Sequence, residues 1–200
     1  MPIIASHWLW FELATLPLYN VAMLRIGSSF KNLTVLSLHA GYPIATLTEM
    51  IINPHNLSIE AFYTANQSKS DKNRSALLIQ DIREASGNRV IIDNADDIRP
   101  VEDLIRLQEM IAINYQLIGK KVMTLSKHNL GKVEEFVAND DDFKIEKLHV
   151  GKPGLLGLKN SKLIINRSQI VSMNDDTIIV KDGTEKITAA KPSFVASPAS

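Results

Sequence analysis

The chain has 200 residues, in which 22 Lys and Arg balance 22 Asp and Glu, 45% of residues are hydrophobic and none is cysteine. This length fits one ordinary domain or two small ones, and the apolar content is sufficient for a core, which excludes a chain disordered throughout. Without cysteine there is no disulfide, thiol nucleophile or Cys-ligated metal centre, so we expect a reducing, cytoplasmic compartment.

Charge is distributed unevenly along the chain. Residues 1–110 hold nine basic and twelve acidic groups, a net charge of −3, whereas residues 111–200 hold thirteen and ten, a net charge of +3. Twelve of those thirteen basic residues are lysines and the other is Arg167. Because lysine lacks the planar fork that binds phosphate or guanine at two points, we interpret the excess as a solvated surface and expect no direct reading of nucleic acid.

Residues 1–22 differ in composition from the rest of the chain, since they hold both tryptophans and a single charged side chain, Glu12. No basic region precedes the apolar stretch, as a secretory signal requires, and Glu12 and Pro17 interrupt it too early for a spanning helix. Two interpretations remain open: an aromatic segment that lies on a membrane surface or a partner, or an extension ahead of a second start at Met23. We favour an extension peripheral to the fold.

Short β-type runs separated by turn residues follow from about Gly27. Strands are expected where apolar residues alternate with polar ones or form short aliphatic runs, and Ser86-Gly87-Asn88 supplies the chemistry of a hairpin turn. The expected strands of this part are residues 35–38, 44–52, 57–63, 76–79 and 90–92.

One segment has helical spacing instead. Pro100 is followed by two acids, which favour the first turn of a helix, and Leu104, Leu107 and Ile111 then recur at a helical interval. The pattern predicts a helix over residues 100–113 that connects two β units. Strand patterns resume from about 117 to 186, and residues 188–200, rich in Ser, Ala and Pro, are predicted to be a disordered tail.

The two β units resemble each other. A shift of 86 positions places Ile44 on Leu130 and Ile59 on Ile145, and it sets residues 77–79 on 163–165. A slip of two residues then aligns residues 90–92 with 178–180. Because apolar positions, turns and strand lengths agree over five segments in order, the pattern predicts two copies of one small β domain.

The second copy carries the motifs of a known family. Its opening, its glycine-containing strand and its ending are residues 117–122 (LIGKKV), 129–133 (NLGKV), 168–172 (SQIVS) and 177–180 (TIIV). This pattern resembles the PRC barrel, a family that includes the cytoplasmic domain of the photosynthetic reaction-centre H subunit and the C-terminal domain of RimM-type ribosome maturation factors. The first copy is a weaker match, with Ala45 where the second has Gly131.

The resemblance implies a mainly all-β protein of two tandem small PRC-like β-barrels joined by one α-helix. The expected division is an extension (1–22), a first barrel (23–99), the helix (100–113), a second barrel (114–187) and the tail. Members of this family typically serve as binding or assembly modules without a catalytic centre. We therefore predict a non-enzymatic scaffold or adaptor for a protein partner.

Other candidate sites in the sequence lack the required patterns. Asp140-Asp141-Asp142 has no calcium-loop layout and is interpreted as a solvated hairpin tip. The five histidines form no closely spaced pair, so neither a metal nor a catalytic site is predicted, and no cofactor is expected. The loop 151–157 lacks the Gly-Lys-Ser/Thr of a phosphate loop.

The residues proposed to contact a partner are two lysines and two leucines: Lys120, Lys121, Leu155 and Leu156. For the leucines, an alternative stays open in which both cover the mouth of the barrel. Two alternatives also stay open for the function. One is a ribosome-maturation factor that binds a small-subunit ribosomal protein, and the other is an assembly module held at a membrane by residues 1–22.

Overall fold

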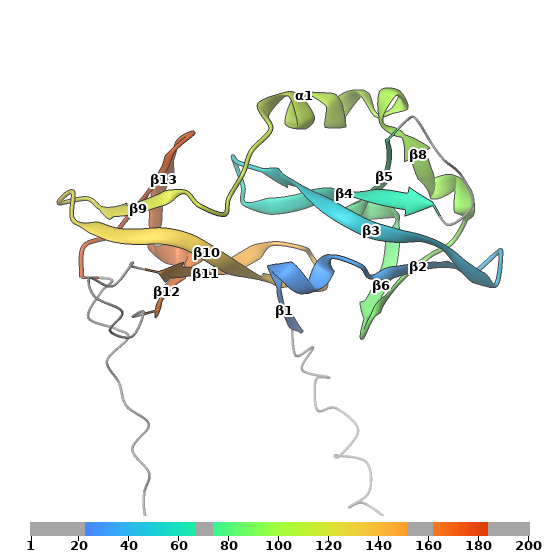
Figure 1. Ribbon diagram of the computed structural model, residues 1–200, viewed down its shortest axis with the longest axis horizontal. Coiled ribbons are helices and arrows are strands. Elements are labelled where there is room, and N and C mark those ends of the chain that lie inside the picture. Colours follow the sequence, from blue (N-terminus) through green and yellow to red (C-terminus); the bar gives the residue numbers. More distant parts are fainter. Residues whose placement is uncertain (1–22, 67–73, 152–161, 184–200) are drawn as a thin grey trace, which may run out of the picture.

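The computed structural model describes residues 23–66, 74–151 and 162–183. They form two seven-stranded sheets and one α-helix, with short 3-10 turns between strands (Figure 1). In the described residues, this confirms the predicted mainly-β class with one α-helix. The N-terminal extension 1–22 and most of the predicted tail lie outside the described residues.

The first sheet has the strand order β6-β7-β2-β3-β4-β5-β8 and the second the order β12-β11-β10-β9-β14-β13, with β1 added on β10. The strands of the first sheet are β2 (Thr34–Ser37), β3 (Tyr42–Asn53), β4 (Ser58–Asn66), β5 (Ser75–Leu78), β6 (Ile82–Ser86), β7 (Arg89–Ile92) and β8 (Ile98–Pro100). Those of the second are β1 (Leu24–Ile26), β9 (Lys121–Thr124), β10 (Asn129–Asn139), β11 (Ile145–Gly151), β12 (Lys162–Asn166), β13 (Ile170–Met173) and β14 (Thr177–Val180).

Six strands of each sheet follow the same path. In both sheets the central hairpin is antiparallel and the first strand pairs in parallel with the last, β2 with β7 and β9 with β14. Ile52 pairs with Ile59 in the first hairpin as Ala138 pairs with Ile145 in the second, which is the predicted offset of 86. We call residues related in this way equivalent.

The offset between equivalent residues rises from 86 to 88 earlier in the chain than the sequence predicts. Phe62 pairs with Leu77 and its equivalent Leu148 pairs with Ile165, so the offset is already 88 in β5 and β12. The predicted alignment of residues 77–79 with 163–165 is therefore wrong by two positions. The reason is the connection before these strands, which has eight residues in the first sheet and ten in the second, and connections tolerate length changes better than paired strands do.

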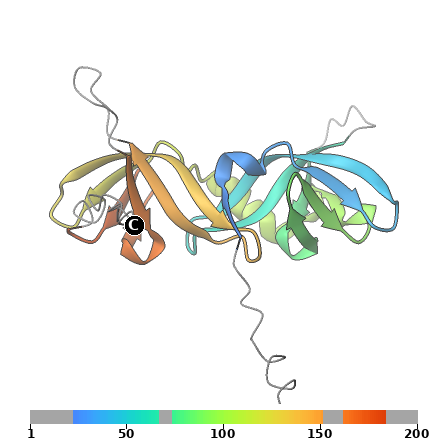
Figure 2. The ribbon, with the colours of Figure 1, turned by 90° about the horizontal axis from the view of Figure 1, so that it is seen from below.

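Two predicted boundaries also differ from the structure. β1 was assigned to the first barrel, but it pairs with β10 of the second sheet. The predicted helix 100–113 is a 3-10 turn η4 (Val101–Asp103) followed by α1 (Ile105–Ile113), which ends at Asn114 in the left-handed conformation. Figure 1 shows α1 above the first sheet, and Figure 2 shows β1 at the junction of the two sheets.

Alternation along the strands buries the two faces of the first sheet against different partners. One face belongs to a core that runs through both sheets, with Phe62, Leu77 and Phe136 almost fully buried. The opposite face of the first sheet is covered by the helical segment, where Leu104 and Leu107 pack on small and branched residues of β3, β4 and β5. The aromatic residues Phe62, Phe136 and Phe143 are all buried.

Candidate functional site

The two sheets meet at the tips of their central hairpins, β3–β4 and β10–β11. The backbone N–H of Ile59 donates to the carbonyl of Phe143 at 3.0 Å, and the N–H of Ile145 donates to the carbonyl of Leu57 at 2.9 Å. Ser58 and Lys144 form an isolated β-bridge between these two bonds. Ile59 is equivalent to Ile145, and Leu57 is equivalent to Phe143, so each sheet donates and accepts the same bond. The contact therefore has the reciprocal pattern of a two-fold interface.

The junction is also reciprocal in backbone conformation. Leu57 and Phe143 are equivalent, both are buried and both have positive φ angles, 47° and 53°. Large side chains rarely adopt this conformation, which costs roughly 1–2 kcal/mol per residue. The ring of Phe143 lies 5.9 Å from that of Phe30 and 6.0 Å from that of Phe62. Tertiary packing between the sheets therefore holds a turn that the local sequence does not favour.

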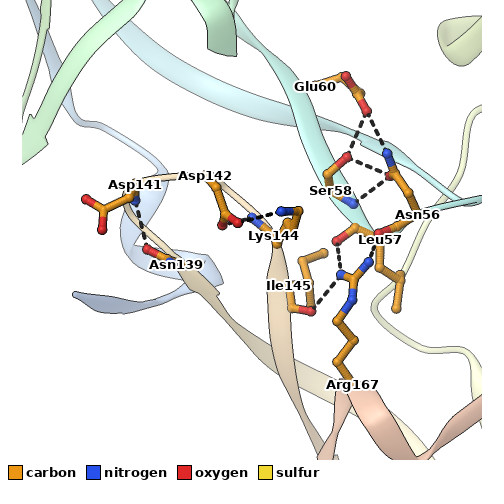
Figure 3. A network of polar contacts seen from close by, with 10 residues as sticks. All are labelled: Asn56, Leu57, Ser58, Glu60, Asn139, Asp141, Asp142, Lys144, Ile145 and Arg167. Carbon is orange, nitrogen blue, oxygen red and sulfur yellow. Dashed lines mark hydrogen bonds and ion pairs between the residues drawn. The ribbon is translucent and has the colours of Figure 1, made fainter. Parts of the chain in front are cut away.

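Arg167 binds the carbonyl groups on one side of this junction. It begins the 3-10 turn η6 (Arg167–Gln169) after β12, and its Nη1 donates to the carbonyls of Leu57 at 3.0 Å and Ile145 at 3.2 Å (Figure 3). Its Nη2 donates to the carbonyl of Asn56. The fixed fork of a guanidinium suits several acceptors, and a carbonyl with two lone pairs can accept a backbone N–H and a guanidinium together.

Polar side chains surround the tips. Glu60 Oε1 accepts hydrogen bonds from Ser58 Oγ at 2.7 Å and from Asn53 Nδ2 at 3.0 Å. Lys144 Nζ donates to Asp142 Oδ2 at 2.7 Å (Figure 3). Partial burial raises the pKa of Asp142, but the hydrogen bonds from Lys144 and the charges of Lys144 and Arg167 outweigh it, and the net pKa lies below the usual range. Asp142 is therefore a carboxylate at neutral pH.

A cavity of about 820 Å³ lies beside the junction, and it is lined by residues other than Arg167. Its walls come from β4, the turn after β5, helix α1 and the β10–β11 tip, including Ile59, Ile79 and Asp142. Ile79 begins the 3-10 turn η2 (Ile79–Asp81) after β5, so it occupies the position equivalent to Arg167. The two sides of the junction thus share a backbone arrangement but differ at this side chain.

β1 is bound to the junction by a buried ion pair. Arg25 Nε lies 2.8 Å from Asp140 Oδ1, with side-chain exposures of 12% and 4%, and Arg25 Nη1 donates to the carbonyl of Gly87 in the first sheet at 2.9 Å. The backbone N–H of Asp140 also donates to the carbonyl of Met23 at 2.8 Å. The prediction of a solvated tip is therefore wrong for Asp140, because β1 covers its carboxylate, whereas Asp141 is exposed.

Two of the four residues predicted to contact a partner, Lys120 and Lys121, are described by the structure, and they differ in exposure. Lys120 is only 7% exposed, its Nζ donates to the carbonyls of Asn174 and Asp175, and it lies 4.3 Å from the centre of the Tyr115 ring. Its ammonium is thus bonded within the fold, whereas Lys121 is exposed at the start of β9 and its role stays a prediction. Leu155 and Leu156 lie outside the described residues.

The burial of Tyr115 leads to a prediction about alkaline titration. Burial raises the pKa of Tyr115 to about 12, above its usual value of 10. Because the folded pKa is raised, the contribution of this phenol to stability should be complete below pH 10 and should be lost as the pH rises toward 12. In an absorbance titration of phenolate, the wild-type chain should contain one tyrosine that ionises above pH 11, and Tyr115→Phe should remove that step. Retention of the late step in the variant would contradict this assignment.

Sequence reasoning missed Arg25 and the tip residue Phe143 as junction contacts, since nothing local distinguishes them. The sequence does distinguish Arg167, because it is the one arginine among the thirteen basic residues of positions 111–200. Within the described ranges, no three His, Asp or Glu side chains are arranged to hold a metal ion. In the same ranges, no helix is both long enough and apolar enough to cross a bilayer.

Comparisons with known proteins agree with the position of the second sheet. No curated protein sequence matches the chain. The family model described as the PRC-barrel domain matches residues 114–187, which include β9 to β14 and the segment that leads into them. The match coincides with the predicted bounds of the second barrel. Residues 114–187 of this chain are therefore similar to the PRC-barrel domain family.

Proposed function

We propose that the protein is a non-enzymatic, protein-binding scaffold in which the first sheet, β2 to β8, acts as a second domain of the PRC-barrel type. The single observation that carries this proposal is the family match of residues 114–187, because PRC-barrel domains are protein-interaction or assembly modules. The common strand order of the two sheets and the offset of 86 in their central hairpins support a second domain of this type.

The junction supports a scaffold with a fixed geometry. A core continuous through both sheets, reciprocal backbone bonds and β1 pairing across the junction all hold the two sheets in one orientation. Domains joined only by a linker reorient freely, whereas a large apolar interface prevents this. A partner would therefore meet two surfaces at a constant spacing, without the entropic cost of ordering them.

The edge of β12 is the best binding surface for a partner strand. Its equivalent in the first sheet, β5, pairs with β8, but among the described residues β12 pairs only with β11. The side chain of Ile164, at the middle of this edge strand, is 46% exposed. An unpaired edge offers backbone donors and acceptors to an added strand, and an apolar side chain beside them adds contact area.

A capture experiment with the full-length chain tests the proposal. We expect the tagged wild-type protein to retain a protein partner at constant stoichiometry from extracts of its own cells, as identified by mass spectrometry. Ile164→Lys should lose at least about tenfold of the retained partner, because a lysine on an edge strand opposes strand addition. A ribosomal protein as the partner would specify the ribosome-maturation alternative.

The matched control is Ile105→Lys, which places the same charge on a residue 79% exposed at the start of α1. This variant should retain the partner as the wild type does. Equal loss in both variants would count against the β12 edge, and a wild-type chain that retains no partner would overturn the scaffold itself.

A further inference from the structure

The junction contains one occupied guanidinium position and one equivalent position without a guanidinium. On the occupied side, Arg167 donates to the carbonyls of Asn56, Leu57 and Ile145. The equivalents of these acceptors are the carbonyls of Asp142, Phe143 and Ile59, and the equivalent of Arg167 is Ile79. An isoleucine side chain donates no hydrogen bond, so it cannot serve these acceptors as Arg167 serves theirs.

We propose that the cavity beside Ile79 binds the guanidinium group of an arginine side chain from a protein partner. This inference rests on the proposed protein-binding function and names the chemistry of one contact. Ile59 and Asp142, which carry two of the three acceptor groups, line the cavity of about 820 Å³ together with Ile79. The third carbonyl, that of Phe143, accepts a hydrogen bond from the N–H of Ile59. Its equivalent, the carbonyl of Leu57, accepts both from the N–H of Ile145 and from Arg167, so a carbonyl at this position can bind a guanidinium as a second donor.

The charges of the cavity favour a cationic group. Its charged lining residues are three acids and two bases, a net charge of −1: Glu60, Glu109, Asp142, Arg106 and Lys144. Lys144 is already paired with Asp142. The carboxylate of Asp142 has no equivalent charge on the Arg167 side, where Asn56 stands in its position. A guanidinium in the cavity would therefore have a carboxylate at a position where the Arg167 side has only an amide.

Binding of a small arginine probe to the full-length chain tests this site directly. The probe is N-acetyl-arginine N-methylamide, and its control is the citrulline analogue, which has the same shape without the charge. We expect saturable changes of backbone amide NMR shifts with a Kd on the order of 1 mM, which is a realistic affinity for a single side chain. The changes should centre on Ile59, Ile79, Gln80 and Asp142, and the citrulline analogue should produce none of them.

Two substitutions at Ile79 test whether the carbonyl groups beside this residue bind the guanidinium of the probe. Ile79→Arg places a guanidinium at the position equivalent to Arg167, so it should fill the site from within and weaken probe binding at least about tenfold. Ile79→Met keeps an apolar side chain of similar volume and should bind the probe as the wild type does. If Ile79→Arg does not fold, Asp142→Asn replaces it, and the loss of the carboxylate should also weaken binding at least about tenfold.

The opposite results would overturn the site. Equal binding of the arginine and citrulline probes, or unchanged binding in a folded Ile79→Arg chain, would show that the carbonyl groups do not hold a guanidinium. Binding that appears only in Arg106→Ala would show that Arg106 of this chain fills the position itself. None of these results would affect partner capture through β12, which Ile164→Lys tests separately, so the scaffold proposal and this site fail independently.

Discussion

Replacing Phe143 with alanine should lower the free energy of unfolding by about 3–5 kcal/mol, the usual loss when a buried phenylalanine is truncated in a core. Phe143 is 3% exposed and lies in contact with the rings of Phe30 and Phe62. Its removal leaves a cavity in the part of the core that the two sheets share. Because the backbone at this position has a φ of 53°, the lost packing also removes the interaction that holds the unfavourable conformation.

Urea unfolding followed by circular dichroism measures this loss. Phe143→Leu is the matched control, since leucine is the residue found at the equivalent position 57, and it should cost less than about 1.5 kcal/mol. We also expect the alanine variant to unfold less cooperatively, with a smaller dependence on urea, because the sheets lose their shared packing. A loss below about 1 kcal/mol in Phe143→Ala would show that the tips contribute little to the junction.

The β architecture was predictable because it depends on periodicity. Alternating apolar residues mark strands locally, and the recurrence of the same pattern after 86 residues indicates a repeat from the sequence alone. The predicted strand over residues 44–52 lies within β3, and the last motif of the family pattern, residues 177–180, forms β14. These features depend on residues close together in the chain.

The junction was not predictable by the same means. Leu57 and Phe143 read as ordinary apolar residues after a turn, and only the packing of one sheet on the other accounts for their positive φ angles. β1 has three residues, too few to show a period, and its partner strand lies more than a hundred residues away. Lys120 was predicted to be an exposed contact residue because a lysine is normally solvated. Its burial depends on Tyr115 and on the carbonyls of the 174–175 turn, which are distant in the sequence or carry no local signal.

The ion pair between Arg25 and Asp140 should have the second large effect on stability. Asp140→Ala leaves the guanidinium of Arg25 largely buried without its carboxylate, and breaking such a pair from one side costs about 3–5 kcal/mol. The exposed pair of Arg83 and Asp93 is the matched control, with side chains 63% and 60% exposed. Asp93→Ala should lose less than about 1 kcal/mol in the same urea measurement.

A double-mutant cycle separates the pair from the general cost of changing a buried residue. Arg25→Met keeps most of the apolar stem without the charge, so the double variant with Asp140→Ala should lose clearly less than the sum of the two single losses. Additive losses would mean that the two charges do not act together. Because Arg25 also donates to the carbonyl of Gly87, Arg25→Met should further weaken the attachment of β1, with faster exchange of the Asp140 amide, which donates to the carbonyl of Met23. That local change distinguishes a strand held by one ion pair from a core that is merely less stable, since Phe143→Ala should increase exchange in both sheets together.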